Sequence, residues 1–216
     1  IISDGANKPY SFRMEGTGAL NTRTFFAEEI TVSSTKGVKY ITLHDKHLIA
    51  AGVEDNLDTV YYSQVNDPTS FTGSGSGAIT ISDQIVGIKG FRTDLFIFCK
   101  SSIHKLININ DADNVAIVPV AENVGCLSGY SIQEIGGDLV FLAPDGIRTL
   151  AGTVRIGDVE LGTVSRSIQP IMKDIADNIG TYNISSIVIR DKSQYRLYYG
   201  SSASGDAAEG IIGTLK

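Results

Sequence analysis

The feature that most constrains the fold is a pattern that occurs four times along the 216 residues. Each copy has a short apolar run, a polar turn and a second apolar run, as expected for a β-hairpin. The copies are YITLHDKHLIAAG (40–52), IKGFRTDLFIFCK (88–100), YSIQEIGGDLVFLA (130–143) and SSIVIRDKSQYRLYYG (185–200). The first apolar residues after the turns are Leu48, Leu95, Leu139 and Tyr195, so the copies recur at intervals of 47, 44 and 56 residues. Such intervals are typical of four-stranded β-propeller blades.

Further strand-like segments follow the hairpins in the same order. A third strand is expected at 58–64, 101–108 and 145–152, and a more polar fourth strand at 77–82 and 114–122. The composition agrees, because 23 glycines, 9 tyrosines and 8 phenylalanines suit short strands joined by tight turns. We therefore predict an all-β chain, a β-propeller with about four blades. An irregular β-sandwich is the alternative.

The same pattern divides the chain into an N-terminal segment at 1–39 and the propeller blades at 40–216. The sequence begins with Ile1 rather than Met, and it ends at Lys216 within a strand-like run. We therefore expect the chain to be part of a longer polypeptide, with an incomplete set of blades.

The longest interval in the repeat contains a segment with helical periodicity. SRSIQPIMKDIADNIG (165–180) places Ile168, Ile171, Met172, Ile175 and Ile179 on one side of a helix. Ser167 is the expected N-cap, Pro170 falls in the first turn, and Gly180 ends the helix. The sequence thus predicts one inserted amphipathic helix at 167–179, packed on the rim of the ring or on a neighbouring subunit.

Charge and cysteine content exclude several classes of protein. The net charge is −6, and lysines and arginines are scattered, which argues against a surface that grips nucleic-acid phosphates. Cys99 and Cys126 lie in apolar surroundings and are expected to be buried thiols rather than a disulfide, as in a protein folded in a reducing cytoplasm. No run of 18 apolar residues is present, so we expect no membrane span.

Motifs for catalysis and for cofactors are missing from the sequence. Without tryptophan, the chain has no Asp-box of the kind found in propeller hydrolases, and GSGSG (73–77) lacks the Lys-Ser/Thr of a phosphate-binding loop. His44 and His47 flank a turn that is expected to be solvated, and His104 is expected on a strand surface. We therefore predict no enzymatic activity and no cofactor.

One polar cluster has the residue types of a calcium loop. Asp111 and Asp113 supply oxygen ligands, and Glu122 falls at the twelfth position counted from Asp111. However, Ala116 stands at the sixth position, where such loops carry glycine, and Asp and Asn favour ordinary turns. The preferred interpretation is a turn without metal, and the three acidic residues are kept as weak candidates.

The region 60–106 resembles a known family. VYYSQVNDPTSF followed by ITISDQIVGIKGFRTDLFIFCKSSIHKL is similar to the β-propeller region of bacteriophage tail proteins, especially the nozzle proteins of short-tailed phages (tail tubular protein B). The resemblance rests on Tyr62-Ser63, Asp67-Pro68, Ile85-Val86-Gly87-Ile88, Leu95-Phe96-Ile97-Phe98 and Lys100-Ser101-Ser102-Ile103. SDGANKPY (3–10) and GDLVFLAPDGIRTL (137–150) resemble further parts of that family.

The resemblance implies a structural protein of the virion tail, assembled in the host cytoplasm. Its partners would be copies of itself in a six-fold ring and neighbouring tail or portal-adaptor proteins. DNA would pass through the ring during ejection without specific binding, which an acidic chain favours.

Two other functions stay open. A receptor- or carbohydrate-binding module of a tail fibre or baseplate would use exposed loop aromatics, for which the candidates are Tyr61, Tyr62, Phe71 and Tyr182. A propeller glycoside hydrolase would need paired carboxylates, but Asp94, Asp138, Asp145 and Asp191 are better explained as turn residues.

Overall fold

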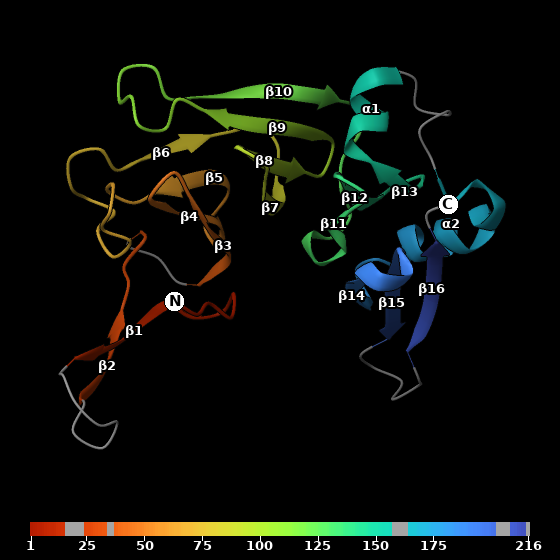
Figure 1. Cartoon of the computed structure of the whole chain (residues 1–216), viewed down its shortest axis with the longest axis horizontal. Coiled ribbons are helices and arrows are strands. Elements are labelled where there is room, and N and C mark those ends of the chain that lie inside the picture. Colours follow the sequence, from red (N-terminus) through yellow and green to blue (C-terminus); the bar gives the residue numbers. More distant parts are fainter. Residues whose placement is uncertain (16–23, 34–36, 157–163, 202–207, 215–216) are drawn as a thin grey trace.

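The computed structural model of the chain describes residues 1–15, 24–33, 37–156, 164–201 and 208–214. Small antiparallel sheets follow one another along an arc, with the N-terminal hairpin near one end and the last sheet at the other (Figure 1). Within each sheet the strands are hydrogen-bonded in chain order. This up-and-down arrangement is that of propeller blades, and the chain is an all-β propeller, as predicted.

Four blades lie within the described residues. The first consists of β3 (Val38–His44), β4 (His47–Val53), β5 (Asn56–Tyr62) and β6 (Gly77–Thr80). The second consists of β7 (Ile85–Phe91), β8 (Asp94–Cys99), β9 (Ser102–Ile107) and β10 (Ala116–Glu122). The third contains β11 (Gln133–Ile135), β12 (Asp138–Ala143) and β13 (Gly146–Thr149), and the fourth contains β14 (Tyr182–Ile189), β15 (Gln194–Ser201) and β16 (Glu209–Thr214). Each predicted hairpin forms the first two strands of a blade.

The second strand of each blade explains why the blades stack on one another. The repeat positions Leu48, Leu95, Leu139 and Tyr195 are each the second residue of such a strand, and all four are buried. They pack towards the preceding blade or, for the first blade, towards the N-terminal segment. The residues that follow Leu48, Leu95 and Leu139 point to the opposite face and pack against the next blade.

Aromatic and small residues close the interface between the second and third blades. The rings of Phe98 and Phe141 lie with their centroids 5.2 Å apart, and Cys126 packs in the same cluster. Cys99 lies in the interface between the first and second blades. Both cysteines are buried and free, as predicted, and burial raises the pKa of each thiol to about 12.

Helices follow the third blade, and the sequence predicted only one of them. α2 (Gln169–Asp177) confirms the amphipathic helix, although its N-cap is Ile168 rather than Ser167, because residues 166–168 form a 3₁₀ turn. Its buried residues Met172 and Ile175 pack between the third and fourth blades. α1 (Leu150–Ile156) occupies part of the segment predicted as a strand at 145–152. The expectation of a single helix is therefore wrong.

The N-terminal segment covers the outer face of the first blade. It contains the hairpin of β1 (Tyr10–Glu15) and β2 (Thr24–Glu29), and residues 16–23 and 34–36 of this segment lie outside the described residues. Ile30 and Val32 follow the hairpin and are buried against the first blade. The backbone N–H of Ile30 donates to Pro9 O at 2.7 Å, which ties the base of the hairpin together.

Among the buried polar side chains, His47 joins the first and second blades, whereas Arg148 pairs within the third blade. His47 is buried rather than solvated as predicted, because Nδ1 lies 2.5 Å from Ser63 O and Nε2 lies 3.2 Å from Asn110 Oδ1. Arg148 is also buried, and its guanidinium forms an ion pair with Asp145.

Among the described residues, none of the helices is long and apolar enough to cross a membrane.

Candidate functional site

The first strands of the four blades lie towards the middle of the arc, so residues at their starts come together (Figure 1). A pocket of about 380 Å³ lies where these starts meet, within the volume range of small-ligand sites. Its lining includes Lys39, Tyr40, Gln84, Lys100, Tyr130, Tyr182 and Asn183. This pocket is called the axial pocket below. All four blades contribute to it.

Tyr40 is held in place by two close backbone approaches. A Cβ added to Gly52 would lie 2.9 Å from Tyr40 Cδ2, and one added to Gly129 would lie 3.1 Å from Tyr40 Cε1. Gly52 also has φ +69°, a conformation that side chains other than glycine rarely adopt. Burial and the nearby Tyr130 hydroxyl raise the pKa of Tyr40, so its hydroxyl keeps its proton at neutral pH and can donate.

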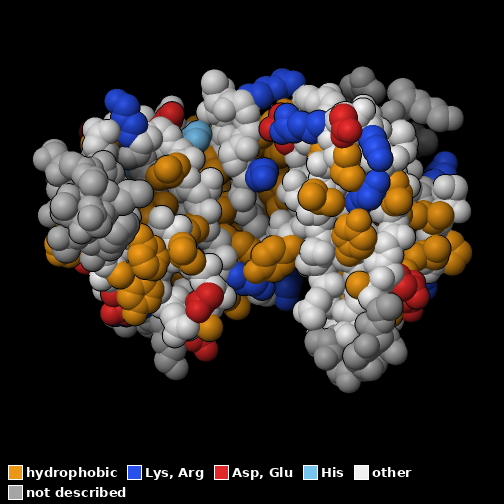
Figure 2. All heavy atoms as spheres, turned by 60° about the horizontal axis from the view of Figure 1, so that its bottom comes forward, with side chains coloured by type: hydrophobic (Ala, Val, Ile, Leu, Met, Phe, Trp, Pro, Cys, Tyr) orange, Lys and Arg blue, Asp and Glu red, His pale blue; other side chains and the backbone are white. Residues whose placement is uncertain are grey.

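The axial pocket is positively charged, although the whole chain has a net charge of −6. Lys39 and Lys100 line it and are exposed, and no Asp or Glu is among its described lining residues. The ammonium of Lys39 lies 5.5 Å from the centroid of the Tyr40 ring, a cation–π contact. Figure 2, which turns the lower side of the arc forward, shows Lys or Arg side chains in the hollow between its two halves.

Neither of these lysines forms an ion pair with a described carboxylate. Other lysines of the chain do, with Lys105 Nζ 3.5 Å from Asp94 and Lys173 Nζ 3.0 Å from Asp177. The charges of the axial pocket are therefore available to an anion from solution.

Two further tyrosines complete the rim of the axial pocket. Tyr130 is 57% exposed, and its backbone oxygen accepts a hydrogen bond of 2.6 Å from Ser186 Oγ. Tyr182 packs against Tyr199 with ring centroids 5.6 Å apart, and its hydroxyl donates to Asp174 at 3.2 Å. Burial raises the pKa of Tyr182, and the carboxylate of Asp174 adds to this effect. The ring of Tyr182 and the backbone of Tyr130 are thus held in place by other parts of the chain.

A second candidate surface is the face of the last blade that points away from the third blade. Register places Ile187, Arg196 and Ile212 in one row across β14, β15 and β16. Ile187 is 53% and Ile212 58% exposed. In the next row the ring of Tyr198 lies over Gly210, where an added Cβ would be 3.1 Å from Tyr198 Cδ1. We call these residues the end face.

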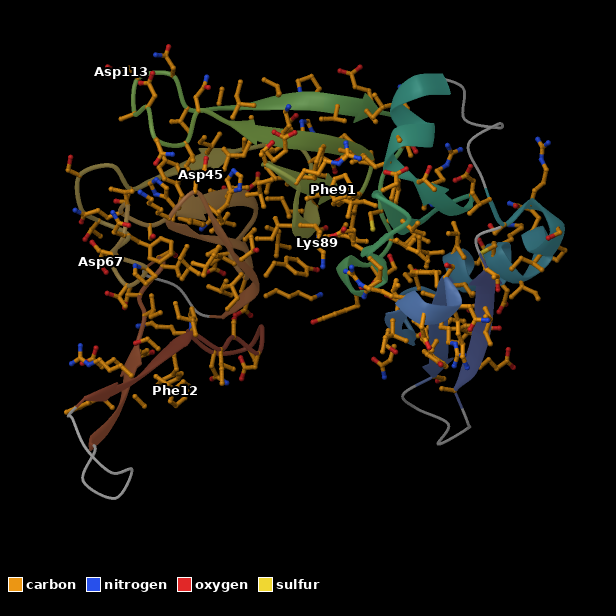
Figure 3. All side chains as sticks on the ribbon, viewed as in Figure 1. Phe12, Asp45, Asp67, Lys89, Phe91 and Asp113 are labelled. Carbon is orange, nitrogen blue, oxygen red and sulfur yellow. The ribbon has the colours of Figure 1, made fainter. Side chains whose placement is uncertain are left out.

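The N-terminal hairpin carries a third surface of similar character. Tyr10 and Phe12 lie on one face of β1 and are exposed, Phe12 by 60%. Glu29 is paired with Tyr10 across the hairpin and therefore shares this face. Figure 3 labels Phe12 on the hairpin, away from the blades. We call Tyr10, Phe12 and Glu29 the hairpin face.

The aromatic residues predicted for ligand binding are mostly not available to a ligand. Tyr62 and Phe71 are buried in the cores on the two faces of the first blade, which corrects the expectation that they are exposed loop aromatics. Tyr61 is partly buried against the same blade. Of the four candidates, Tyr182 alone lines the axial pocket. Lys39 and Lys100 were not predicted as site residues, because they are 61 positions apart in the sequence and belong to no motif.

The structure does not bring the weak metal candidates together. The carboxylate of Asp111 accepts hydrogen bonds from its own loop, from Asn114 Nδ2 at 2.8 Å and from Asp113 N at 3.2 Å. Figure 3 shows Asp113 on this loop, whereas Glu122 is the last residue of β10, about 20 Å along the strand from its first residue. Among the described residues, no group of three or more His, Cys, Asp or Glu side chains could hold a metal ion.

The carboxylates considered for a hydrolase stand at turns or strand starts, outside the axial pocket. Asp94 and Asp138 begin β8 and β12, Asp145 precedes β13, and Asp191 lies in a 3₁₀ turn. Asp94 lies 3.5 Å from Lys105 Nζ, and Asp145 pairs with Arg148. Their interpretation as turn residues is consistent with these positions.

Comparisons with known proteins show a similarity in structure and none in sequence family. No protein family model matches the chain, and no curated protein matches it. Among solved structures, the chain is similar to the N-terminal domain of Nup159, with 13% sequence identity and a TM-score of 0.46. The alignment covers 88% of this chain and 46% of that structure, so the chain spans about half the length of that domain.

Proposed function

We propose that this chain is a structural component of a bacteriophage tail and that its propeller joins copies of itself head to tail in a ring. The observation that carries the proposal is the end face, where the exposed Ile187 and Ile212 flank the half-buried Arg196. Exposed apolar surface around a central arginine is typical of protein–protein contacts. The same position of the repeat is apolar in the other blades, where it is covered.

The identity of the residue at that position favours a partner protein over a further apolar core. Where Arg196 stands, the first three blades have Ile49, Phe96 and Val140, all buried between blades. Burying a guanidinium between two apolar sheets is unfavourable unless a carboxylate pairs with it. The covering surface should therefore present both apolar side chains and a carboxylate.

The hairpin face of a second copy has this chemistry. It presents the exposed rings of Tyr10 and Phe12 beside Glu29, whose carboxylate already lies 3.5 Å from Lys8 Nζ. A contact between different surfaces of identical chains is heterologous, and such contacts form closed rings when the rotation allows it. The family resemblance implies a six-fold ring.

Two features support the placement in a phage tail. The sequence resembles that of the nozzle proteins of short-tailed phages around Tyr62-Ser63, Asp67-Pro68 and Lys100–Ile103. A net charge of −6 also suits a conduit through which DNA must pass without being held.

Immunogold labelling of purified virions with an antibody against this chain tests the placement. We expect the gold label at the neck or at the tip of the tail. Label on projecting fibres would contradict the conduit and favour receptor binding, and virions without label would contradict a virion protein altogether.

A further inference from the structure

We propose that the axial pocket binds an acidic carbohydrate, with a sugar ring against the tyrosines and a carboxylate between Lys39 and Lys100. This inference rests on the lining of the pocket and does not depend on ring assembly. A single chain would therefore bind the sugar whether or not it assembles.

The positive charge of the pocket favours a negatively charged ligand. Lys39 and Lys100 have no described carboxylate as ion-pair partner, and the described lining contains no acidic residue. In a chain that is acidic overall, this leaves a local site for an anion. Lysines act as point charges, so they suit a carboxylate without demanding the two-pronged geometry of arginine.

The neutral groups of the pocket suit a ring that carries hydroxyl groups. Gln84 and Asn183 can each donate and accept hydrogen bonds, as sugar hydroxyls do. The ring of Tyr130 is 57% exposed, and the backbone of this residue is fixed by Ser186. Tyr40 is fixed by Gly52 and Gly129. Rings that are already in place lose little conformational freedom when a ligand stacks on them.

These features favour a carbohydrate over a nucleic acid. The described lining contains no arginine, the residue best suited to bidentate phosphate binding, and the sequence has no glycine-rich phosphate loop.

A glycan array with the purified chain, followed by calorimetric titration, tests the inference. The array should retain oligosaccharides that carry a uronic or sialic acid and should not retain their neutral counterparts. The carboxyl methyl ester of the best-retained sugar is the matched ligand control, since it keeps the ring and removes the charge. We expect esterification to weaken binding about tenfold or more.

Single substitutions then assign the binding to the axial pocket. Lys39→Gln and Lys100→Gln should each weaken binding about fivefold, and Tyr130→Ala should weaken it by a similar factor. These side chains are exposed, so the variants should fold. Lys46→Gln is the control, because Lys46 lies at the other end of the same hairpin and outside the pocket. Its affinity should equal that of the wild type.

Three results would overturn the inference. The first is an array that retains no carboxylated glycan, and the second is equal affinity for the acid and its ester. The third is displacement of the sugar by inorganic phosphate or by a short oligonucleotide at equal concentration, which would indicate a general anion site. None of these results bears on whether the chain assembles into rings.

Discussion

The second strand of the third blade, β12, and that of the last blade, β15, differ in how their two faces are buried. In β12 both faces are buried, with Leu139 and Phe141 packed towards the second blade and Val140 and Leu142 towards the fourth. In β15 the face with Tyr195 and Leu197 is buried, whereas Arg196 and Tyr198 on the other face remain accessible.

This difference distinguishes the residues that stabilise the fold from the residues that we propose to mediate assembly. Residues in the interfaces between blades touch partners on another sheet, so removing them leaves a cavity. Residues of the end face have no such partner within the described chain, so changing them should alter association and leave folding intact.

The largest expected effect is on folding, from the interface between the second and third blades. Phe98→Ala should lower the free energy of unfolding by about 4 kcal/mol, because it removes a fully buried ring that packs on Phe141. Tyr198→Ala, on the end face, should lower it by less than about 1 kcal/mol. Urea unfolding followed by circular dichroism measures both, and equal losses would contradict this distinction.

The next effect is on association, through the central charge of the end face. Arg196→Glu should weaken self-association about tenfold or more, because it would place two carboxylates together at the proposed contact with Glu29. The double variant with Arg196→Glu and Glu29→Arg should recover most of the loss. Sedimentation velocity measures the association. A double variant as weak as the single one would show that these two residues do not meet.

A smaller, chemical difference concerns the thiols inside the blade interfaces. Cys99 and Cys126 are fully buried, and burial raises the pKa of each to about 12. At pH 8 neither should react with a thiol reagent within minutes in the folded chain, and both should react in urea. Rapid reaction of either cysteine in native buffer would mean that its interface opens readily.

The smallest effect is a dependence of stability on pH at His104. Burial lowers the pKa of His104 below its usual value of about 6.5, against the opposing charges of Asp83 and Glu122. The unfolded chain then binds more protons, so stability is complete above about pH 6.5 and is lost as the pH falls through the folded pKa. His104→Gln should flatten the dependence between pH 5 and 7 in urea titrations, and an unchanged slope would contradict this.

Local pattern predicted most of the fold. The hairpins at 40–52, 88–100 and 185–200 could be read from apolar runs around polar turns, because a β-strand and its turn depend mainly on neighbouring residues. The repeat interval then indicated the blade, since each blade is built from one such set of strands.

What could not be predicted depends on residues far apart in the chain. α1 is capped partly from another element: the N–H of Ala151 donates to the carboxylate of Asp138 on β12, while the N–H of Gly152 donates to the adjacent Thr149 Oγ1 at 3.1 Å. His47 is buried because Ser63 and Asn110 reach it from other segments.

The candidate site was missed for the same reason. Lys39, Lys100 and Tyr130 come from three different blades, and only the curvature of the arc brings them to one pocket. Aromatic content pointed to Tyr62 and Phe71 instead, which the sheets bury. Tyr182 alone among the candidates begins an innermost strand, which is the position that the pocket uses.

Mixing two variants that each lack one surface tests the head-to-tail assembly most directly. Ile187→Asp disables the end face, and Phe12→Asp disables the hairpin face; both side chains are more than half exposed, so both variants should fold. Leu43→Asp, at a position 70% exposed and outside both surfaces, is the control. We expect rings or larger assemblies from the wild type and the control, and monomers from each variant alone.

A mixture of the two variants tests whether the end face binds the hairpin face. An equimolar mixture of the two variants retains one intact end face and one intact hairpin face, so it should form dimers and nothing larger when measured by sedimentation velocity. A mixture that stays monomeric, or a single variant that assembles like the wild type, would contradict the head-to-tail contact.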